Sequence, residues 1–524
     1  MHAVPPPSVS VLPRENAGFC HNIAAVLAVA ATWFSMFCHP LRTEAADQRP
    51  NVLLICVDDL KPLLGCYGDK RVSSPNIDRL AARGILFERA YSNQAICAPS
   101  RNTLLTGRRP DSLGIYDLGT NFRVAAPNAV TLPQFFKQRG YRTEGLGKIF
   151  HVGHGNHEDP ASWSVPHWSA AVIAYALPES RADQGLTREE ALFANRSASG
   201  LPRGAAFESA DVPDDAYPDG RLALETVRRL EKAAQQADRR FFIAVGFVKP
   251  HLPFCAPKRY WDLYDRDSFE LAPHQNPPAG APPYAPQFGG ELRQYSGVPA
   301  SGPIPEGLQR TLIHGYHAAI SYMDAQLGRV LDAFDRLDLA KNTIIVLWGD
   351  HGWHLGDHGI WCKHTNYEQA TRIPVLIVAP EITKPGSRTG ALIETVDLYP
   401  TLCELAGLAL PQGPAKLDGQ SLVPLLKNPT AHSKNAVFHV YPRHPRGRGM
   451  ILGRAVRTER HRLVEWKQPG ADPDSAEFEL YDYQEDPLET KNVAASHPQV
   501  VAELRAVLAG LPEARPQAAK PTTP

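Results

Sequence analysis

The residue with the sharpest chemical signal is Cys97, which opens the segment CAPSR at residues 97–101. Pro99 biases Ala98 away from helical backbone, so we expect a helix to begin only around Ser100, with Cys97 just ahead of it. A helix N-terminus favours an anion, either a thiolate or a bound oxyanion. A lone cysteine is more often a buried structural residue, and a thiolate nucleophile of the cysteine-hydrolase kind is a third interpretation. The pentapeptide alone does not decide among them.

Reactive side chains also follow four predicted strands, at the point where each strand ends. They are Asp58 and Asp59 after residues 51–57, Lys148 and His151 after 141–147, Lys249 and His251 after 241–248, and Asp350 and His351 after 343–348. Ligands of open α/β sheets bind beyond the carboxyl ends of the strands. A single charge at a strand end is as often part of a solvated loop, but four coincidences favour one shared site.

Adjacent carboxylates at the first of these strand ends point to a metal ion. Asp58 and Asp59 would repel each other strongly if they were close and buried, and a cation is the simplest remedy. Carboxylate oxygens favour Ca²⁺ or Mg²⁺. A zinc site competes with this interpretation, because four imidazoles crowd one short segment. They are His351, His354, His358 and His364. We expect His351 to lie near the metal, and the other three to be mixed in role.

The elements that must position these residues alternate between strand and helix, which predicts an α/β doubly wound sheet. Continuous apolar runs at 51–57, 241–248, 343–348 and 374–379 are typical of strands buried on both faces. Helical patterns cover residues 75–84, 221–237 and 314–337, the first with Ser74 as N-cap and Pro75 at the first position. The segment 273–306 is dense in Pro and Gly and is predicted to be a long surface insertion. Alternating patterns within 436–493 predict a smaller antiparallel domain.

Composition restricts the class of protein. The 524 residues carry 55 Lys+Arg and 55 Asp+Glu, and a net charge of zero argues against a nucleic-acid binder. Residues 23–37 form an apolar run too short for a membrane span of about 20 residues. With Arg14 ahead of it and Thr43-Glu44-Ala45 as a cleavage site, it predicts a signal peptide, the alternative being an uncleaved anchor. The eight cysteines are few, so the core and not disulfides should hold the fold.

Taken together, these motifs resemble the type I, formylglycine-dependent sulfatase family, and most closely its iduronate-2-sulfatase branch. The likeness extends over about residues 50 to 494. Its longest motifs are NVLLICVDDLKPLLGCYGDKRVSSPNIDRLA, QAICAPSRNTLLTGRRPDSLGIYD, GYRTEGLGKIFHVG, VGFVKPHLPF and GDHGWHLGDHGIWCKHTNYEQATRIP. The resemblance implies an alkaline-phosphatase-like fold, with a mixed, mostly parallel sheet flanked by helices and a smaller C-terminal antiparallel-sheet domain. The expected parts are a signal peptide at 1–46, a catalytic α/β domain at 47–425, a C-terminal α+β subdomain at 426–511 and a disordered tail at 512–524.

The resemblance also implies roles for individual residues. The implied metal site, for one Ca²⁺, consists of Asp58, Asp59, Asp350 and His351, with Cys97 beside them. Many sulfatases have Asn where His351 stands, and a nitrogen ligand is softer than calcium prefers. The implied catalytic and sulfate-binding groups are Cys97 as formylglycine precursor, Arg101 holding the modified side chain, Lys148 and His151 around the hydrate and the sulfate, and His251 and Lys363 at the sulfate and the leaving oxygen. Trp353 is a candidate sugar contact, with simple packing as an equal alternative.

The function that the resemblance implies is calcium-dependent hydrolysis of the sulfate ester of a sulfated sugar, from the end of a glycosaminoglycan-like chain. It requires a formylglycine-generating enzyme as partner. It also implies export, to the periplasm or outside a bacterial cell or to the lysosome of an animal cell, with no membrane attachment after signal cleavage. Two alternatives stay open: a phosphate or phosphonate monoesterase of the same superfamily, and a non-catalytic sugar-binding relative.

Overall fold

A mixed seven-stranded sheet forms the centre of the protein in the computed structural model, which describes residues 49–519 except 182–184, 237, 288 and 412–415. Its strand order is β3 (Arg142–Gly147), β5 (Phe241–Phe247), β1 (Asn51–Val57), β7 (Thr343–Gly349), β8 (Arg372–Val378), β2 (Ile85–Tyr91) and β9 (Ser387–Glu394). Only β8 runs antiparallel to its neighbours. The carboxyl ends of the other six strands therefore meet at one edge of the sheet.

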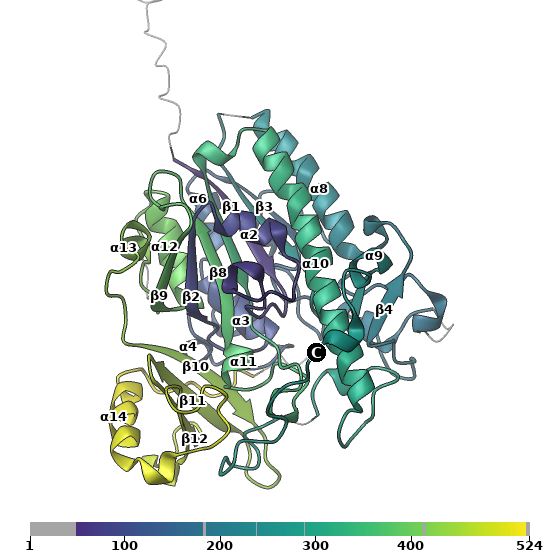
Figure 1. The fold of residues 1–524 in the computed structure, drawn as a ribbon. Helices are drawn as coiled ribbons and strands as arrows, with labels where there is room; N and C mark the ends of the chain where they lie inside the picture. Colours follow the sequence, from purple (N-terminus) through teal and green to yellow (C-terminus); the bar gives the residue numbers. More distant parts are fainter. Residues whose placement is uncertain (1–48, 182–184, 237, 288, 412–415, 520–524) are drawn as a thin grey trace, which may run out of the picture. The chain divides into compact units, whose positions relative to one another are not determined.

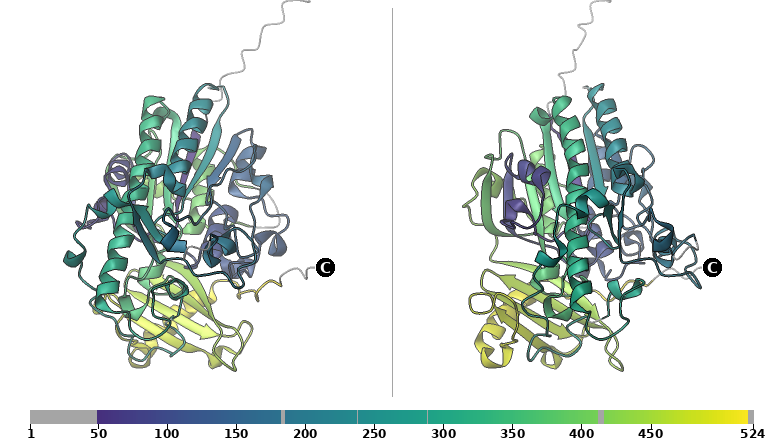
Figure 2. Two further views of the ribbon diagram at one scale, coloured as in Figure 1. Left: turned by 90° about the vertical axis from the view of Figure 1, so that its right-hand side faces the viewer. Right: turned by 45° about the vertical axis from the view of Figure 1, so that its right-hand side comes forward.

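Two helical layers cover the sheet and explain why β1 is apolar throughout. One face packs against α2 (Pro75–Ala81), α8 (Pro218–Ala234) and α10 (Glu306–Arg336), with α8 and α10 side by side (Figures 1 and 2). The other packs against α3 (Cys97–Thr106), α6 (Leu132–Gln138) and α12 (Leu398–Leu405). Alternate residues of β1 enter these two cores, Leu53 and Ile55 the first, Val52 and Leu54 the second.

A second sheet of four antiparallel strands lies beside the carboxyl edge (Figure 1). It consists of β10 (Ala436–Arg443), β11 (Ile451–Thr458), β12 (His461–Lys467) and β13 (Glu477–Asp482), and α14 (Pro498–Ala509) packs on it. Asn93, just beyond β2, donates a hydrogen bond to the carbonyl oxygen of Phe438 at 2.7 Å and so ties β10 to that edge. The other short elements are α4 (Pro110–Leu113), α5 (Phe122–Ala125), α7 (Arg188–Phe193), β4 (Phe207–Ala210), β6 (Phe254–Pro257), α9 (Lys258–Trp261), α11 (Glu368–Thr371) and α13 (Val423–Lys427).

The structure confirms the predicted fold class, and it corrects several element ends. The helix predicted at 221–237 begins at Pro218, and the one predicted at 314–337 begins at Glu306, directly after Pro305. The helix expected around Ser100 begins at Cys97. Pro99 is tolerated there because the amide groups of the first helical turn have no partner within the helix, so a missing N–H costs nothing.

Ser74 precedes α2 as predicted but does not cap it. Its hydroxyl accepts the N–H of Gly65 at 3.0 Å instead. The carboxylate of Asp324, on α10, accepts the N–H groups of Asn76 and Ile77 at 3.1 and 2.7 Å. The cap of this helix therefore comes from a residue about 250 positions away.

Two segments expected at the surface are partly packed. Segment 273–306 buries Ala285, Leu292 and Tyr295, so it is more than a surface insertion. The described part of the predicted disordered tail contacts the body, because the N–H of Arg515 donates to the carbonyl of Asp111 at 3.0 Å and Ala514 is buried. The predicted signal peptide lies outside the described residues. Within the described residues no helix is long and apolar enough to span a bilayer, and the six cysteines there are all free.

Candidate active site

The residues predicted from the motifs converge at the carboxyl edge of the central sheet. Register explains part of this, because Val57 at the end of β1 pairs with both Phe247 of β5 and Gly349 of β7. The chain segments that follow these strands are therefore level with one another. The predicted site residues are all buried: Asp58, Asp59, Cys97, Arg101, Lys148, His151, His251, Asp350, His351, Trp353 and Lys363.

Arg101 links several groups of this cluster through hydrogen bonds. Its guanidinium, fully buried, donates from Nη2 to Asp58 Oδ1 at 2.8 Å and from Nε to Asp350 Oδ2 at 3.0 Å. It also donates to the carbonyl oxygens of Lys148 and Ile149. One side chain from the start of α3 thus ties together the ends of β1, β3 and β7.

The backbone of Asp59 has an unusual conformation that its neighbours hold in place. Its φ of 57° lies in the left-handed region, which is costly for a residue with a β-carbon and occurs where the surroundings impose it. Tyr316 of α10 imposes it here, since its hydroxyl donates to the carbonyl of Asp59 at 2.7 Å and accepts the N–H of Lys61 at 3.1 Å. Asp350 Oδ1 accepts the N–H of Asp59 at 2.9 Å.

Cys97 faces this cluster. Its Sγ lies 3.4 Å from His351 Nε2 and 3.9 Å from Lys148 Nζ. Burial raises the pKa of the Cys97 thiol well above its ordinary value, and the charge of Asp58 raises it further. An unmodified thiol here stays protonated at neutral pH, which argues against the thiolate-nucleophile interpretation.

The three aspartates differ in charge state. Burial opposes ionisation of Asp58, but its ion pairs with Lys148 and Arg101 outweigh burial and hold the pKa well below the ordinary value. Burial raises the pKa of Asp59 well above its ordinary value, and burial followed by repulsion from Asp58 raises that of Asp350 to about 7. Carboxyl groups lie close together here, and the neighbouring cations do not balance the charge that they would carry if all were ionised.

This arrangement fits a metal ion. Ligand atoms of Asp58, Cys97, Asp350 and His351 lie within 4.8 Å of one another, and Asp59 enters a second such set with Asp58, Cys97 and His251. His351 Nδ1 lies 3.1 Å from the carbonyl of Gly352, so Nδ1 carries the proton and the Nε2 lone pair faces the carboxylates. A donor set dominated by carboxylates suits Ca²⁺.

The structure argues against the competing zinc interpretation, which needs the imidazoles of residues 351–364 to lie close together. Among the described residues, no metal-spaced set includes the other three imidazoles of that segment. His354 Nε2 lies 2.9 Å from the hydroxyl of Thr365, and the ring of His358 packs against Tyr367. Only His351 of the four joins the cluster.

Lys363 and His251 approach two of the aspartates. Lys363 Nζ is 3.1 Å from Asp59 Oδ2, and His251 Nε2 is 3.9 Å from Asp58 Oδ2. Glu291, which no sequence motif singles out, lies close to both: its Oε2 is 2.5 Å from Lys363 Nζ and its Oε1 is 3.3 Å from His251 Nε2.

Two other contacts were not predicted. His151 Nε2 lies 3.2 Å from Nδ1 of His154, which itself has a left-handed φ of 55°. The ring of Phe193, at the end of α7, packs against His151 and His251 with centroids 5.9 and 5.6 Å apart, and Lys148 Nζ lies 5.1 Å above it. A partner three residues along the chain could have been suspected for His151, whereas Phe193 comes from a short helix that carries no catalytic motif.

Lys249 and Trp353 make structural contacts. Lys249 Nζ donates to the carbonyls of His251 and Pro253 at 2.8 and 2.6 Å, which holds the turn that presents His251. Trp353 is fully buried, its ring packs on Phe254, and Lys363 Nζ lies 5.1 Å above it. The other predicted site residues are buried to a similar degree, so a sugar contact by Trp353 stays a prediction beside the packing alternative.

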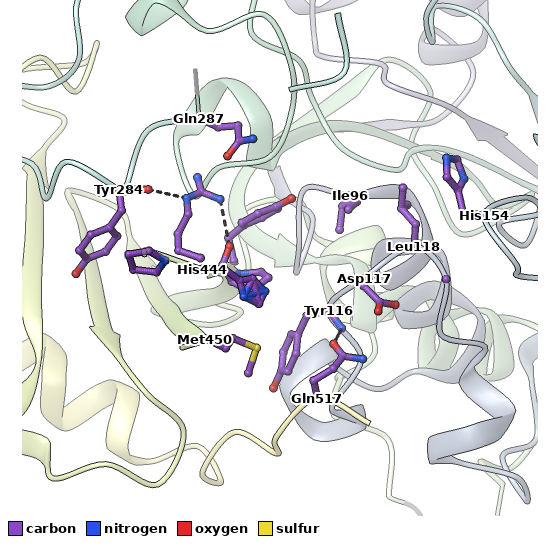
Figure 3. A pocket seen from close by; sticks show the side chains of 15 residues that line it. Ile96, Tyr116, Asp117, Leu118, His154, Tyr284, Gln287, His444, Met450 and Gln517 are labelled. Atoms are coloured by element: carbon purple, nitrogen blue, oxygen red, sulfur yellow. Dashed lines mark hydrogen bonds between the residues drawn. The ribbon is translucent and has the colours of Figure 1, made fainter. Parts of the chain in front are cut away.

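A cavity of about 1030 Å³ opens beside the cluster (Figure 3). Ile96, next to Cys97, lines it, as does His154. The opposite wall comes from the second sheet, at the end of β10, with Tyr441 and His444. Its volume is that of a site for a ligand larger than a sulfate ion.

Comparison with known proteins gives consistent matches. Residues 50–408 match the sulfatase family model, and residues 356–513 match the model for the C-terminal region of N-sulphoglucosamine sulphohydrolase. The chain is 37% identical to iduronate 2-sulfatase of Mus musculus over 530 residues, covering 87% of this chain and 94% of that protein. For the Homo sapiens enzyme of that name the identity is 36% over 510 residues, covering 84% and 90%.

Solved structures show the same fold at lower identity. A protein in complex with its substrate D-glucosamine-2-N,6-O-disulfate aligns with a TM-score of 0.68 at 22% identity, over 88% of this chain and 97% of that one. The phosphonate monoester hydrolase of Silicibacter pomeroyi also aligns with a TM-score of 0.68, at 23% identity, over 88% and 95%. These likenesses bear on fold alone.

Proposed function

The chain belongs to the sulfatase family, and we propose that this sulfuric ester hydrolase is calcium-dependent and cleaves a sulfated sugar, with iduronate 2-sulfate the first substrate to test. The observation that carries the proposal is the convergence of Cys97, Arg101, Lys148 and Lys363 on one buried cluster of aspartates. A large cavity lies nearby, lined by Ile96 and His154, which are close in the chain to Cys97 and His151. The cavity leaves room for sugar units beyond the sulfated one.

Two groups would supply the chemistry that the bare side chains lack. Formylglycine made from Cys97 would supply the nucleophile and a second hydroxyl for release of sulfate, and Ca²⁺ held by Asp58, Asp59, Asp350 and His351 would supply positive charge. Making formylglycine requires a modifying enzyme as partner. Export follows from the apolar run at 23–37.

The chain's own cations serve the anionic substrate. Arg101, Lys148 and Lys363 are positioned to offset the charge of a sulfate and the charge that develops as its ester bond breaks. Burial opposes protonation of Lys363, but Asp59 and Glu291 outweigh it and raise its pKa well above the ordinary value. Burial lowers the pKa of His251 to about 3. Lys363 is therefore the better donor of a proton to the leaving oxygen.

His151 is the group that we assign to accepting a proton on the nucleophile side. Burial, followed by the charge of Lys148, lowers its pKa well below the ordinary value, which keeps the imidazole neutral. Its Nε2 faces Nδ1 of His154, so the pair can share one proton.

A phosphate or phosphonate monoesterase is the second candidate, because a phosphonate monoester hydrolase shares the fold equally well. The sequence relatives above 30% identity that cover most of the chain favour sulfate. A non-catalytic sugar binder would not need the buried cysteine, the lysines and the arginine in contact.

The test is a substrate panel with Cys97→Ala as the inactive variant. We expect release of sulfate from an iduronate 2-sulfate disaccharide and from an aryl sulfate, and at least a roughly 10³-fold loss of kcat in C97A, since the nucleophile is removed. Cys403→Ala, at a buried cysteine in α12, is the matched control and should retain activity.

Mass spectrometry of the same preparations tests the formylglycine. The peptide that contains Cys97 should be lighter by about 18 Da in active protein, from thiol to aldehyde. Active protein with an unmodified thiol would exclude that nucleophile. Faster turnover of aryl phosphate than of aryl sulfate would replace the proposal by the second candidate.

A further inference from the structure

Glu291 is a partly buried charge that the proposed chemistry leaves without a role. An acidic group is unexpected among residues that would bind an anion, because it repels the ligand. Yet its carboxylate spans the two residues proposed to contact the sulfate and the leaving oxygen, at 2.5 Å from Lys363 Nζ and 3.3 Å from His251 Nε2. Its side chain is 20% exposed, whereas that of Lys363 is 2% exposed.

The chain is built to place this carboxylate. Gly290 has a φ of 74°, and a β-carbon there would lie 2.8 Å from Sγ of Cys362, the neighbour of Lys363. Only a glycine lets the backbone pass this close in that conformation. Leu292 and Tyr295 then anchor the segment in the main core. The approach of Glu291 to Lys363 is thus fixed from both sides along the chain.

Lys363 needs such a partner. Its other carboxylate contact is Asp59, which is also a proposed metal ligand. A carboxylate shared with a cation attracts the ammonium less, whereas Glu291 belongs to neither metal-spaced set among the described residues. His251 Nδ1 faces the carbonyl of Leu252 at 2.5 Å, so in the neutral ring Nε2 carries a lone pair and donates no hydrogen bond to Glu291. The contact that Glu291 can hold is therefore the one with Lys363.

We propose that Glu291 is a positioning residue, which holds the Lys363 ammonium in the place where it meets the leaving oxygen of the ester. The proposal rests on the proposed sulfatase function. It predicts that hydrolysis depends on Glu291 when the leaving group needs a proton. Nitrophenolate leaves as a stable anion, so the hydrolysis of nitrophenyl sulfate should not depend on Glu291.

The experiment compares Glu291→Gln with the wild-type holoenzyme on a sugar sulfate and on nitrophenyl sulfate. Gln keeps the shape but loses the charge that holds the lysine. We expect kcat to fall roughly 30-fold on the sugar sulfate, where protonation is worth 10²-fold or more, and less than about 3-fold on nitrophenyl sulfate, with KM little changed. Glu291→Asp should restore part of the loss. Glu306→Gln, at an acidic residue of the first turn of α10, is the control and should resemble wild type.

A crystal structure of E291Q gives a readout that does not depend on turnover. We expect Lys363 to leave its wild-type position or to occupy more than one. The proposal is overturned if Lys363 keeps its place, if both esters lose rate equally, or if both are hydrolysed faster, which would make the carboxylate an obstruction. If wild type hydrolyses neither ester, the sulfatase function falls and this role falls with it; wild-type activity with an unaffected E291Q removes the role alone.

Discussion

At the scale of single residues, the site is a cluster of opposite charges that do not balance. Four carboxylates, those of Asp58, Asp59, Asp350 and Glu291, face three cations, those of Arg101, Lys148 and Lys363. Removing charges from water is costly unless each is paired. The raised pKa values of Asp59 and Asp350 express that cost.

Metal removal should therefore destabilise the folded protein. A divalent cation lets the aspartates ionise together, so we expect chelation to lower Tm and Ca²⁺ at about 100 times its Kd to restore roughly 3 °C, for a stabilisation of about 3 kcal/mol. Differential scanning calorimetry measures it. Asp350→Asn should lose the response to Ca²⁺, and Asp267→Asn, at an exposed carboxylate, should keep it. An equal response in D350N would contradict a metal at this cluster.

At the scale of elements, α10 positions parts of the fold that are far away in sequence. Tyr316 holds the turn that carries Asp59, and Asp324, two helical turns further on, caps α2. Tyr322 on the same helix donates to the carbonyl of Asp214 and accepts the N–H of Gly220 at the start of α8. A long central helix thus fixes the starts of two neighbours and one turn of the site.

Replacing Asp324 by Ala should destabilise the protein, because it removes the side chain that caps α2. The loss of an N-cap carboxylate that accepts two backbone N–H groups is worth about 1 to 2 kcal/mol in the free energy of unfolding, measured by denaturant titration. The free energy of unfolding of Asp324→Asn should lie between the values for wild type and D324A, since an amide offers one acceptor oxygen. Asp332→Ala, at an exposed partner of Arg79 on the same helix, should change the free energy by less than about 0.5 kcal/mol. Equal effects of D324A and D332A would mean that Asp324 is not the cap.

At the scale of the whole molecule, the core contains neutral histidines outside the site. His317 is buried beside Phe269, with ring centroids 4.6 Å apart, and its Nδ1 lies 2.8 Å from the carbonyl of Ile313. Burial lowers its pKa to about 4. A depressed folded-state pKa contributes stability that is present above the unfolded value of about 6.5 and is lost as the pH falls through 4.

The free energy of unfolding of the His317→Phe variant should accordingly depend less on pH. Phe fits among the aromatic neighbours and cannot be protonated, so the drop in the free energy of unfolding between pH 7 and pH 4 should shrink by up to about 3 kcal/mol. Urea titrations at several pH values measure it. His432→Phe, at an exposed position, should leave the slope unchanged. An unaltered slope in H317F would mean that folding does not lower the pKa of His317.

The sequence alone determined the strands, and it predicts which residues at their ends carry the chemistry. The predicted bounds of β1 are the observed ones, because a strand buried on both faces must be apolar throughout, and Asp58 and Asp350 come directly after the apolar runs of β1 and β7. The predicted fold class was also confirmed, since it depends on the order of local patterns.

Only the tertiary structure decided how these residues meet. Nothing near Ser74 reveals that Asp324 caps the next helix, and nothing near Glu291 reveals that it reaches Lys363, 72 positions away. The pKa values of Asp58 and Asp59, neighbours of the same type, shift in opposite directions. Lys148 and Arg101 outweigh the burial of Asp58, whereas Lys363 does not outweigh the burial of Asp59. Local patterns encode burial and period, whereas the energy of a buried charge depends on partners that the folded chain brings from elsewhere.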